Sequence, residues 1–346
     1  MLLTKNIFLD TSVMIAHHFK YDSVQLRRLR ELAQSNDAHL VTTSIVIDEM
    51  EANIRKRVDK LGEDLKRLRK DHPIAKNITA PALWSTTEIF NPAVACEQLI
   101  AQFNDYLEKS NTELVSLDGA SAQEVFDWYF KKVAPFGGGE KKHEFPDAFT
   151  VSALEHWCAT RDERLYVISE DGDLADYCKR SKRLIRLSRP AEFIDTYMRQ
   201  TTALKFINEP SAEQMDHLLV AVSEAFGQLG FFIDDEEGEV LEVSVGDVEI
   251  EELSLLEVKP HEARVEAFVQ LQFVAQVEYD DMETSIWDSE DKVSIPQRSI
   301  KSELARTFEA NVVLTIKTEG DGGFASVKNV QFPTSNIPVS VDRYEE

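Results

Sequence analysis

The chain contains few cysteines, and none of them stands in a pattern that indicates a metal site or a disulfide framework. Three cysteines occur among 346 residues, far from one another and without neighbouring histidines at ligand spacing: Cys96, Cys158 and Cys178. An odd number of scattered cysteines is typical of buried thiols in a reducing compartment. We therefore expect neither zinc nor disulfides, and we expect a cytoplasmic protein.

Long apolar runs are also absent. No stretch of the sequence reaches the roughly 20 apolar residues that a membrane-spanning helix needs. The first ten residues, MLLTKNIFLD, lack the basic start and the small-residue cleavage site of a secretory signal. The GxSxG and HExxH motifs of serine hydrolases and zinc proteases do not occur either. These absences exclude a membrane partner and the common nucleophile-based and zinc-based hydrolases.

Positive charge is scarce in one half of the chain only. Residues 201–346 contain 10 Lys and Arg against 31 Asp and Glu, whereas residues 1–200 contain 28 against 31. The first half can therefore approach a polyanion, and the second half repels one. Domains average about 150 residues, so a chain of this length predicts two. We predict one domain over 1–200 and an acidic domain over 201–346.

Strand and helix signals alternate along the first half. Short apolar runs such as Ile7–Leu9 and Tyr166–Ile168 precede segments with helical periodicity, as in βαβ units with a parallel sheet. The second half has one helix signal, over 210–229, followed by runs with the period of two that is typical of antiparallel strands. These runs cover 240–248, 265–279, 310–317 and 325–332. We expect an α/β domain with a parallel central sheet, followed by an α+β domain rich in antiparallel strands.

Four acidic residues fall where a parallel sheet would gather them. Asp10 and Asp171 follow predicted strands, Glu49 lies early in a long helix, and Asp147 lies in the first turn of another helix. The carboxyl ends of parallel strands form one edge, where open α/β sheets build their sites. Carboxylates that converge repel one another unless a cation neutralises them, and oxygen ligands suit Mg²⁺ or Mn²⁺. The pattern predicts a metal-dependent phosphodiesterase.

Each acid also has an ordinary structural interpretation. Asp10 can cap a helix, and an acid at the position of Asp147 is favoured by the helix dipole. Asp48 is a second candidate beside Glu49, and Asp173 either caps the helix that follows it or assists the metal. The four acids together favour the metal site.

The order of these segments resembles the PIN-domain nuclease family. The segments are IFLDTS, SIVIDEM, EFPDAF and YVISEDGDL, and the third is similar to the Lys-x-Glu-Phe-Pro-Asp-Ala motif of a bacterial PIN-like subgroup. The resemblance covers roughly residues 4–190. It implies a three-layer PIN-like domain, Mg²⁺ or Mn²⁺ as the cofactor, and RNA as the favoured substrate. It also implies the metal ligands Asp10, Glu49, Asp147 and Asp171, supported by Asp173.

Basic residues near these acids are candidates for binding a phosphodiester backbone. The segment from Lys179 to Arg189 has six positive charges and no acid. Two lysines lie in a glycine-rich loop just before Asp147, and the basic helix over 55–70 fits either a phosphate contact or an ordinary solvated surface. The candidate substrate-binding residues are Thr11, Ser12, Lys141, Lys142, Lys179, Arg180, Lys182 and Arg183.

We interpret the chain as a metal-dependent endonuclease that hydrolyses phosphodiester bonds, in RNA rather than DNA. The resemblance suggests that it acts as a bacterial toxin or as a phage-defence (antiviral) effector. A structure-selective DNA nuclease is one alternative. A catalytically silent PIN-fold binding or scaffold protein is another. The acidic second half then provides solubility, self-association or a surface for a protein partner.

Overall fold

The computed structural model describes residues 2–71, 90–136, 144–170, 172–201, 207, 210–259, 261–288, 293–319 and 323–341. The chain divides into two compact units, Met1–Ile194 and Asp195–Glu346. None of the helices in the described residues is both long enough and apolar enough to cross a membrane.

A five-stranded parallel sheet forms the centre of the first unit. Its order is β3-β2-β1-β4-β5, and every neighbouring pair is parallel. The strands are β1 (Asn6–Leu9), β2 (His39–Thr43), β3 (Glu113–Val115), β4 (Leu165–Ile168) and β5 (Leu184–Leu187). The chain steps outward from β1 to β3 and then returns across the sheet to β4 and β5. Right-handed crossovers therefore place the two groups of connecting helices on opposite faces. The prediction of a parallel α/β domain is confirmed.

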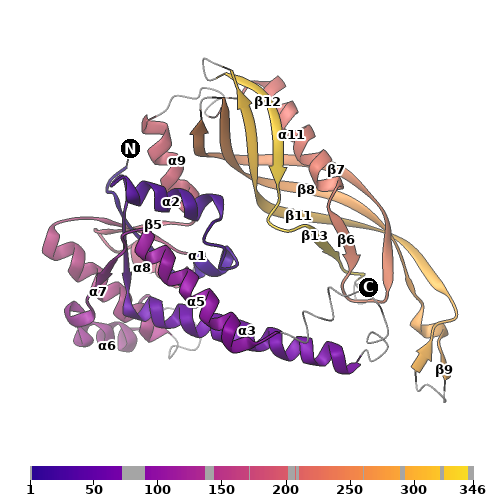
Figure 1. Ribbon diagram of the computed structural model, residues 1–346, viewed down its shortest axis with the longest axis horizontal. Helices are drawn as coiled ribbons and strands as arrows, with labels where there is room; N and C mark the ends of the chain where they lie inside the picture. Colours follow the sequence, from indigo (N-terminus) through magenta and orange to yellow (C-terminus); the bar gives the residue numbers. More distant parts are fainter. Residues whose placement is uncertain are drawn as a thin grey trace. The chain divides into compact units, whose positions relative to one another are not determined.

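The helices of this unit follow the strands in sequence (Figure 1). They are α1 (Thr11–Ala16), α2 (Val24–Gln34), α3 (Ser44–Asp71), α5 (Pro92–Lys109), α6 (Ala122–Lys131), α7 (Phe145–Arg161), α8 (Gly172–Cys178) and α9 (Pro190–Thr201), with a short 3₁₀ helix η2 (Leu117–Gly119). Every residue of β1 and β4 is buried, as central strands covered on both faces should be. The three cysteines are free and buried, as predicted.

Local sequence explains where α3 begins. Ser44 is its first residue, and the hydroxyl of Thr43 accepts a hydrogen bond from the amide of Val46 at 3.3 Å. Thr43, the last residue of β2, therefore caps the helix with a side chain that reaches the first free amides.

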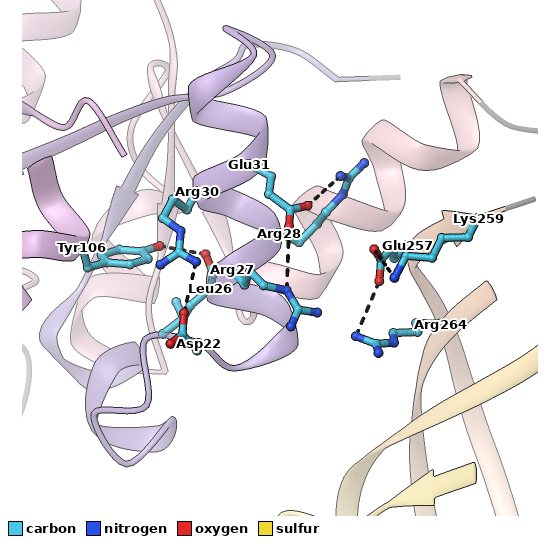
Figure 2. Close-up of polar contacts among 10 residues, drawn as sticks. All are labelled: Asp22, Leu26, Arg27, Arg28, Arg30, Glu31, Tyr106, Glu257, Lys259 and Arg264. Carbon is cyan, nitrogen blue, oxygen red and sulfur yellow. Dashed lines mark hydrogen bonds and ion pairs between the residues drawn. The ribbon is translucent and has the colours of Figure 1, made fainter. Parts of the chain in front are cut away.

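Polar contacts hold α2 in place, as Figure 2 shows. The hydroxyl of Tyr106, on α5, donates to the carbonyl oxygen of Leu26 at 3.2 Å, and burial raises the pKa of that hydroxyl. Arg30 pairs with Asp22 just before the helix at 3.1 Å. A buried hydroxyl needs such a partner, so the contact specifies how α5 packs on α2.

The second unit is built on an antiparallel sheet in the order β12-β11-β8-β7. Its long strands are β7 (Gly238–Lys259), β8 (Glu262–Asp280) and β11 (Ser299–Thr318), with the shorter β12 (Phe324–Gln331). Helix α11 (Ala212–Gly227) packs on β7 and β12 through Leu218, Val222 and Phe226 (Figure 1). The smaller elements are β6 (Gly230–Ile233), η4 (Met282–Thr284), β9 (Ile286–Asp288), β10 (Val293–Ile295) and β13 (Asn336–Val339). The predicted antiparallel character of this half is confirmed.

Strand β7 departs from the predicted period of two. Its register against β8 shifts at four places, after Val240, Val245, Ile250 and Leu255. Each shift is a β-bulge that adds one residue on the β7 side. Eight apolar residues of β7 are therefore spaced alternately by three and two positions, and each lies opposite an apolar residue of β8. They are Val240, Val243, Val245, Val248, Ile250, Leu253, Leu255 and Val258.

Candidate active site

Asp10 lies at the carboxyl end of β1, next to the carboxyl end of β4. Its amide donates to the carbonyl oxygen of Ile168 at 3.0 Å, so the two strand ends are joined at this point. Its side chain is the N-cap of α1 and accepts a hydrogen bond from the amide of Ser12 at 3.3 Å. Only 7% of the residue is exposed. Both interpretations of Asp10 thus apply to one residue, which caps a helix and lies at the sheet edge where ligands bind.

Two serine hydroxyls fix the carboxylate of Asp10. Ser169, which is fully buried just after β4, donates to Oδ2 of Asp10 at 2.9 Å, and the hydroxyl of Ser12 donates to the same oxygen. The Ser12 hydroxyl also accepts from the amide of Glu170 at 3.2 Å. The three bonds from the Ser169 hydroxyl, the Ser12 hydroxyl and the Ser12 amide all end on Oδ2, and none of these three ends on Oδ1. The carboxylate therefore has a fixed orientation and keeps Oδ1 for another ligand.

Glu49 brings a second carboxylate to this place from the first turns of α3. The hydroxyl of Thr11 donates to its Oε2 at 3.0 Å. Burial, reinforced by the negative charge of Asp10, raises the pKa of the Glu49 carboxyl, while the Thr11 hydrogen bond lowers it. Asp48, the alternative candidate, is exposed. The structure thus joins Glu49, and not Asp48, to the neighbourhood of Asp10.

Asp147 lies in the first turn of α7, after Pro146. The N-cap residue Glu144 makes no side-chain capping bond, so the acid in the first turn is the group that complements the helix dipole. Asp147 is partly exposed. Across the described ranges, no group of three or more His, Cys, Asp or Glu side chains is close enough to hold a metal ion. The contacts described above link Asp10 with Glu49, and Asp147 lies in the first turn of α7.

Several predicted site residues cannot be placed. Asp171, Lys141 and Lys142 lie outside the described residues. Asp173 belongs to the backbone of α8, which begins at Gly172, and its side chain is outside the described set.

The predicted basic residues near β5 lie at the surface. Lys179 pairs with Asp176 at 2.7 Å, and the guanidinium of Arg180 lies over the ring of Tyr177 at 5.5 Å. Lys182 is exposed and Arg183 is partly buried. These contacts leave the cationic groups of Lys179 and Arg180 at the protein surface, where they can still meet a phosphate.

Sequence reasoning missed two residues at this edge. Ser169 is one of them. The other is Arg186 on β5, whose guanidinium lies 3.5 Å from the carbonyl oxygen of Ser169. Arg186 belongs to the basic segment, and its register opposite Val167 of β4 was the signal that would have identified it. A serine after a strand carries no such signal.

The donor set fits a hard divalent cation. The two linked side chains offer carboxylate oxygens only, and the charge of Asp10 opposes the ionisation of Glu49. A cation between them would relieve that repulsion, and oxygen donors are the ligands of Mg²⁺ and Mn²⁺.

Comparison with protein families gives one match. The model of the PIN domain matches residues 7–174, which contain β1 to β4 and every placed candidate acid. No curated protein and no solved structure matches the chain significantly.

Proposed function

Because residues 7–174 belong to the PIN domain family, whose members are generally nucleases, we propose that this protein is a divalent-cation-dependent endonuclease. The observation that carries the proposal is the pairing of Asp10 and Glu49. They come from different elements and are oriented by hydroxyl groups, and burial, together with the negative charge of Asp10, raises the pKa of Glu49.

In this proposal the cation is held by Asp10 and Glu49 together with Asp147 and Asp171, and Asp173 assists. A bound Mg²⁺ or Mn²⁺ supplies an activated water and stabilises negative charge on the phosphodiester. Ser12 and Ser169 keep Oδ2 of Asp10 occupied. Oδ1 would consequently be the oxygen available to a cation. Thr11 holds Glu49, so its role is to position a ligand, in addition to the substrate contact that the sequence predicted.

Basic side chains of the protein are proposed to bind the phosphodiester backbone of the substrate. Arg186 contacts the carbonyl oxygen of Ser169, whose side chain binds Asp10, and Lys179, Arg180, Lys182 and Arg183 belong to the same basic segment. Lys141 and Lys142 are assigned the same role by their place in the third motif. Each such contact makes binding weaker as salt increases.

Cleavage assays on matched substrates test the proposal. Purified protein with Mn²⁺ is expected to cut single-stranded RNA faster than DNA of the same sequence, and EDTA should stop the reaction. Asp10→Asn and Glu49→Gln should abolish cleavage, and Asp48→Asn serves as a matched control that retains it. Full activity in excess EDTA, or in Asp10→Asn, would contradict the proposal. If branched DNA is cut faster than RNA, the protein is instead a structure-selective DNA nuclease.

The acidic residues 201–346 are proposed to serve a protein partner or self-association, while residues 1–200 contact nucleic acid. A net charge of −21 repels phosphates at low salt and is screened at high salt.

We also propose that the enzyme acts as a toxin or phage-defence effector in the cytoplasm. Expression of the wild type, but not of Asp10→Asn, should then slow growth, with or without infection.

A further inference from the structure

Helix α6 presents two phenylalanine rings to solvent. Phe130 is 75% exposed and Phe126 is 45% exposed. They lie four residues apart, on one side of the helix, and their rings stack with centroids 6.4 Å apart and an interplanar angle of 27°. The helix already contributes Val125 and Trp128 to the core. The exposed pair is therefore additional to the residues that attach α6 to the unit.

These rings rest on a rigid aromatic base. Tyr129 packs edge-on against Phe130 at 5.4 Å and against the fully buried Phe136, also at 5.4 Å. Phe145 contacts Phe126, Tyr129 and Phe136 at centroid distances of 5.6, 5.1 and 5.0 Å. A surface ring held from behind loses little conformational freedom on contact with a ligand, which favours binding.

The base also connects the exposed rings to the candidate active site. Phe145 is the first residue of α7, and Asp147 lies two residues later in the same turn, about 3 Å further along the helix axis. The path from Phe130 through Phe126 to Phe145 therefore ends in the same helical turn as Asp147, a carboxylate proposed to act in cleavage.

Positive charge flanks the exposed ring of Phe130. Lys131 and Lys132 follow it directly, and both are exposed. Lys131 pairs with Asp127 at 3.2 Å, whereas Lys132 ends the helix with φ of 53° and makes no ion pair within the described part of the chain. Apolar ring faces beside lysines are the combination that binds single-stranded nucleic acid, with bases stacked on rings and phosphates near cations.

We propose that Phe126 and Phe130 form a stacking platform for unpaired bases, which directs a single strand toward Asp147. This rests on the proposed nuclease function and adds to it the class of substrate. Bases inside a duplex have both faces covered by their neighbours, so only unpaired bases can stack on protein rings. Every base has an aromatic face, and the platform is accordingly tolerant of sequence.

Binding to fluorescein-labelled oligouridine, measured by anisotropy on the full chain in EDTA, tests the platform without cleavage. The double variant Phe126→Leu/Phe130→Leu keeps an apolar surface and removes both ring faces. Its affinity for the single strand should fall roughly tenfold or more. Its affinity for the duplex with oligoadenine should not change. Phe232→Leu, at an exposed phenylalanine of the second unit, is the matched control and should bind as the wild type does.

A second variant reports on stacking directly. Phe130→Trp should bind the single strand as tightly as the wild type, and its added fluorescence should be quenched by oligouridine. Undiminished single-strand affinity in the leucine variant, or an equal loss on duplex, overturns the platform and leaves the rings as a surface for a protein. The nuclease proposal is separate. If the wild type does not cleave but the leucine variant loses single-strand binding, the platform stands and the nuclease proposal fails. If cleavage depends on Asp10 but the leucine variant binds normally, the nuclease proposal stands and the platform fails.

Discussion

The hydroxyl of Thr11 donates a hydrogen bond to Oε2 of Glu49 at 3.0 Å, which ties the start of α1 to the first turns of α3. Thr11 is the residue after Asp10, so one side chain connects the two carboxylates of the candidate site. The hydrogen bond also lowers the pKa of Glu49, against the effects of burial and of Asp10. Changes at Thr11 should therefore alter the protonation of Glu49 without removing either carboxylate.

Thr11→Val is expected to shift the pH dependence of cleavage. Without the hydroxyl, the pKa of Glu49 rises further, so the ionised ligand forms only at higher pH. The acidic limb of the cleavage profile should move to higher pH, and activity near neutral pH should fall by roughly 10- to 100-fold, as for other groups that support metal ligands. Thr11→Ser keeps the hydroxyl and should keep the profile. An unshifted profile in Thr11→Val would show that the bond does not govern Glu49.

Glu49→Gln should stabilise the metal-free protein at neutral pH. The pKa of Glu49 is raised in the folded state, so this residue favours folding below its unfolded pKa and loses that contribution as pH rises through the folded pKa. Glutamine does not ionise, so the variant avoids the free-energy cost of a buried negative charge. The melting temperature should rise by roughly 2–4 °C for each kcal/mol of unfolding free energy gained. Thermal scans with and without Mn²⁺ check this: Mn²⁺ should raise the melting temperature of the wild type and of Asp48→Asn, but not that of Glu49→Gln.

Ser169→Ala should reduce cleavage more than it reduces stability. The substitution removes a buried hydrogen bond to Oδ2 of Asp10 and should cost about 1 kcal/mol of unfolding free energy. Asp10 keeps its bonds to Ser12 but loses the bond from β4, and the looser orientation of its carboxylate should reduce kcat by roughly 10-fold or more. Ser152, which is also buried and hydrogen-bonded, is the matched control. Equal activity of Ser169→Ala and Ser152→Ala, at equal stability, would argue against an orienting role.

Arg186→Gln should weaken nucleic-acid binding in a salt-dependent way. If Arg186 contacts one phosphate, its loss should reduce the slope of log affinity against log salt by about 1. Arg161→Gln is a suitable control, because that guanidinium is engaged with Glu113 at 2.8 and 2.9 Å. An unchanged slope in Arg186→Gln would remove this residue from the substrate path.

The sequence predicts the architecture of the first unit because its signals are local. Short apolar runs followed by helical periodicity occur at β1 and β4, and the helix dipole favours an acid at Asp147. The short strand β3 carries no such run, since only Val115 of its residues is buried. The role of Ser169 was equally unpredictable, because its partner Asp10 is 159 residues away in sequence.

The exposure of Phe130 is a different case. Aromatic residues at i and i+4 predict a buried helix face, and the sequence offers no reason to place this pair in solvent. Only the packing of Val125 and Trp128 against the core decides which side of α6 faces outward. The apolar residues of β7 do form a regular pattern in the sequence. Its alternate spacings of three and two residues fit neither a regular strand nor a helix, so the strand's full length is not predicted from either period.

The bulges of β7 give this strand an adjustable length. In a regular strand, the gain or loss of one residue moves every later side chain to the opposite face. At a bulge, the extra residue can be lost while the flanking apolar residues keep their partners on β8. Strand β7 has four such places at five-residue intervals. Single-residue deletions should therefore be tolerated at the first three of these points, whereas the extra residue of the fourth is the fully buried Leu256. Relatives of this unit can thus differ in the length of β7 while sharing the same core.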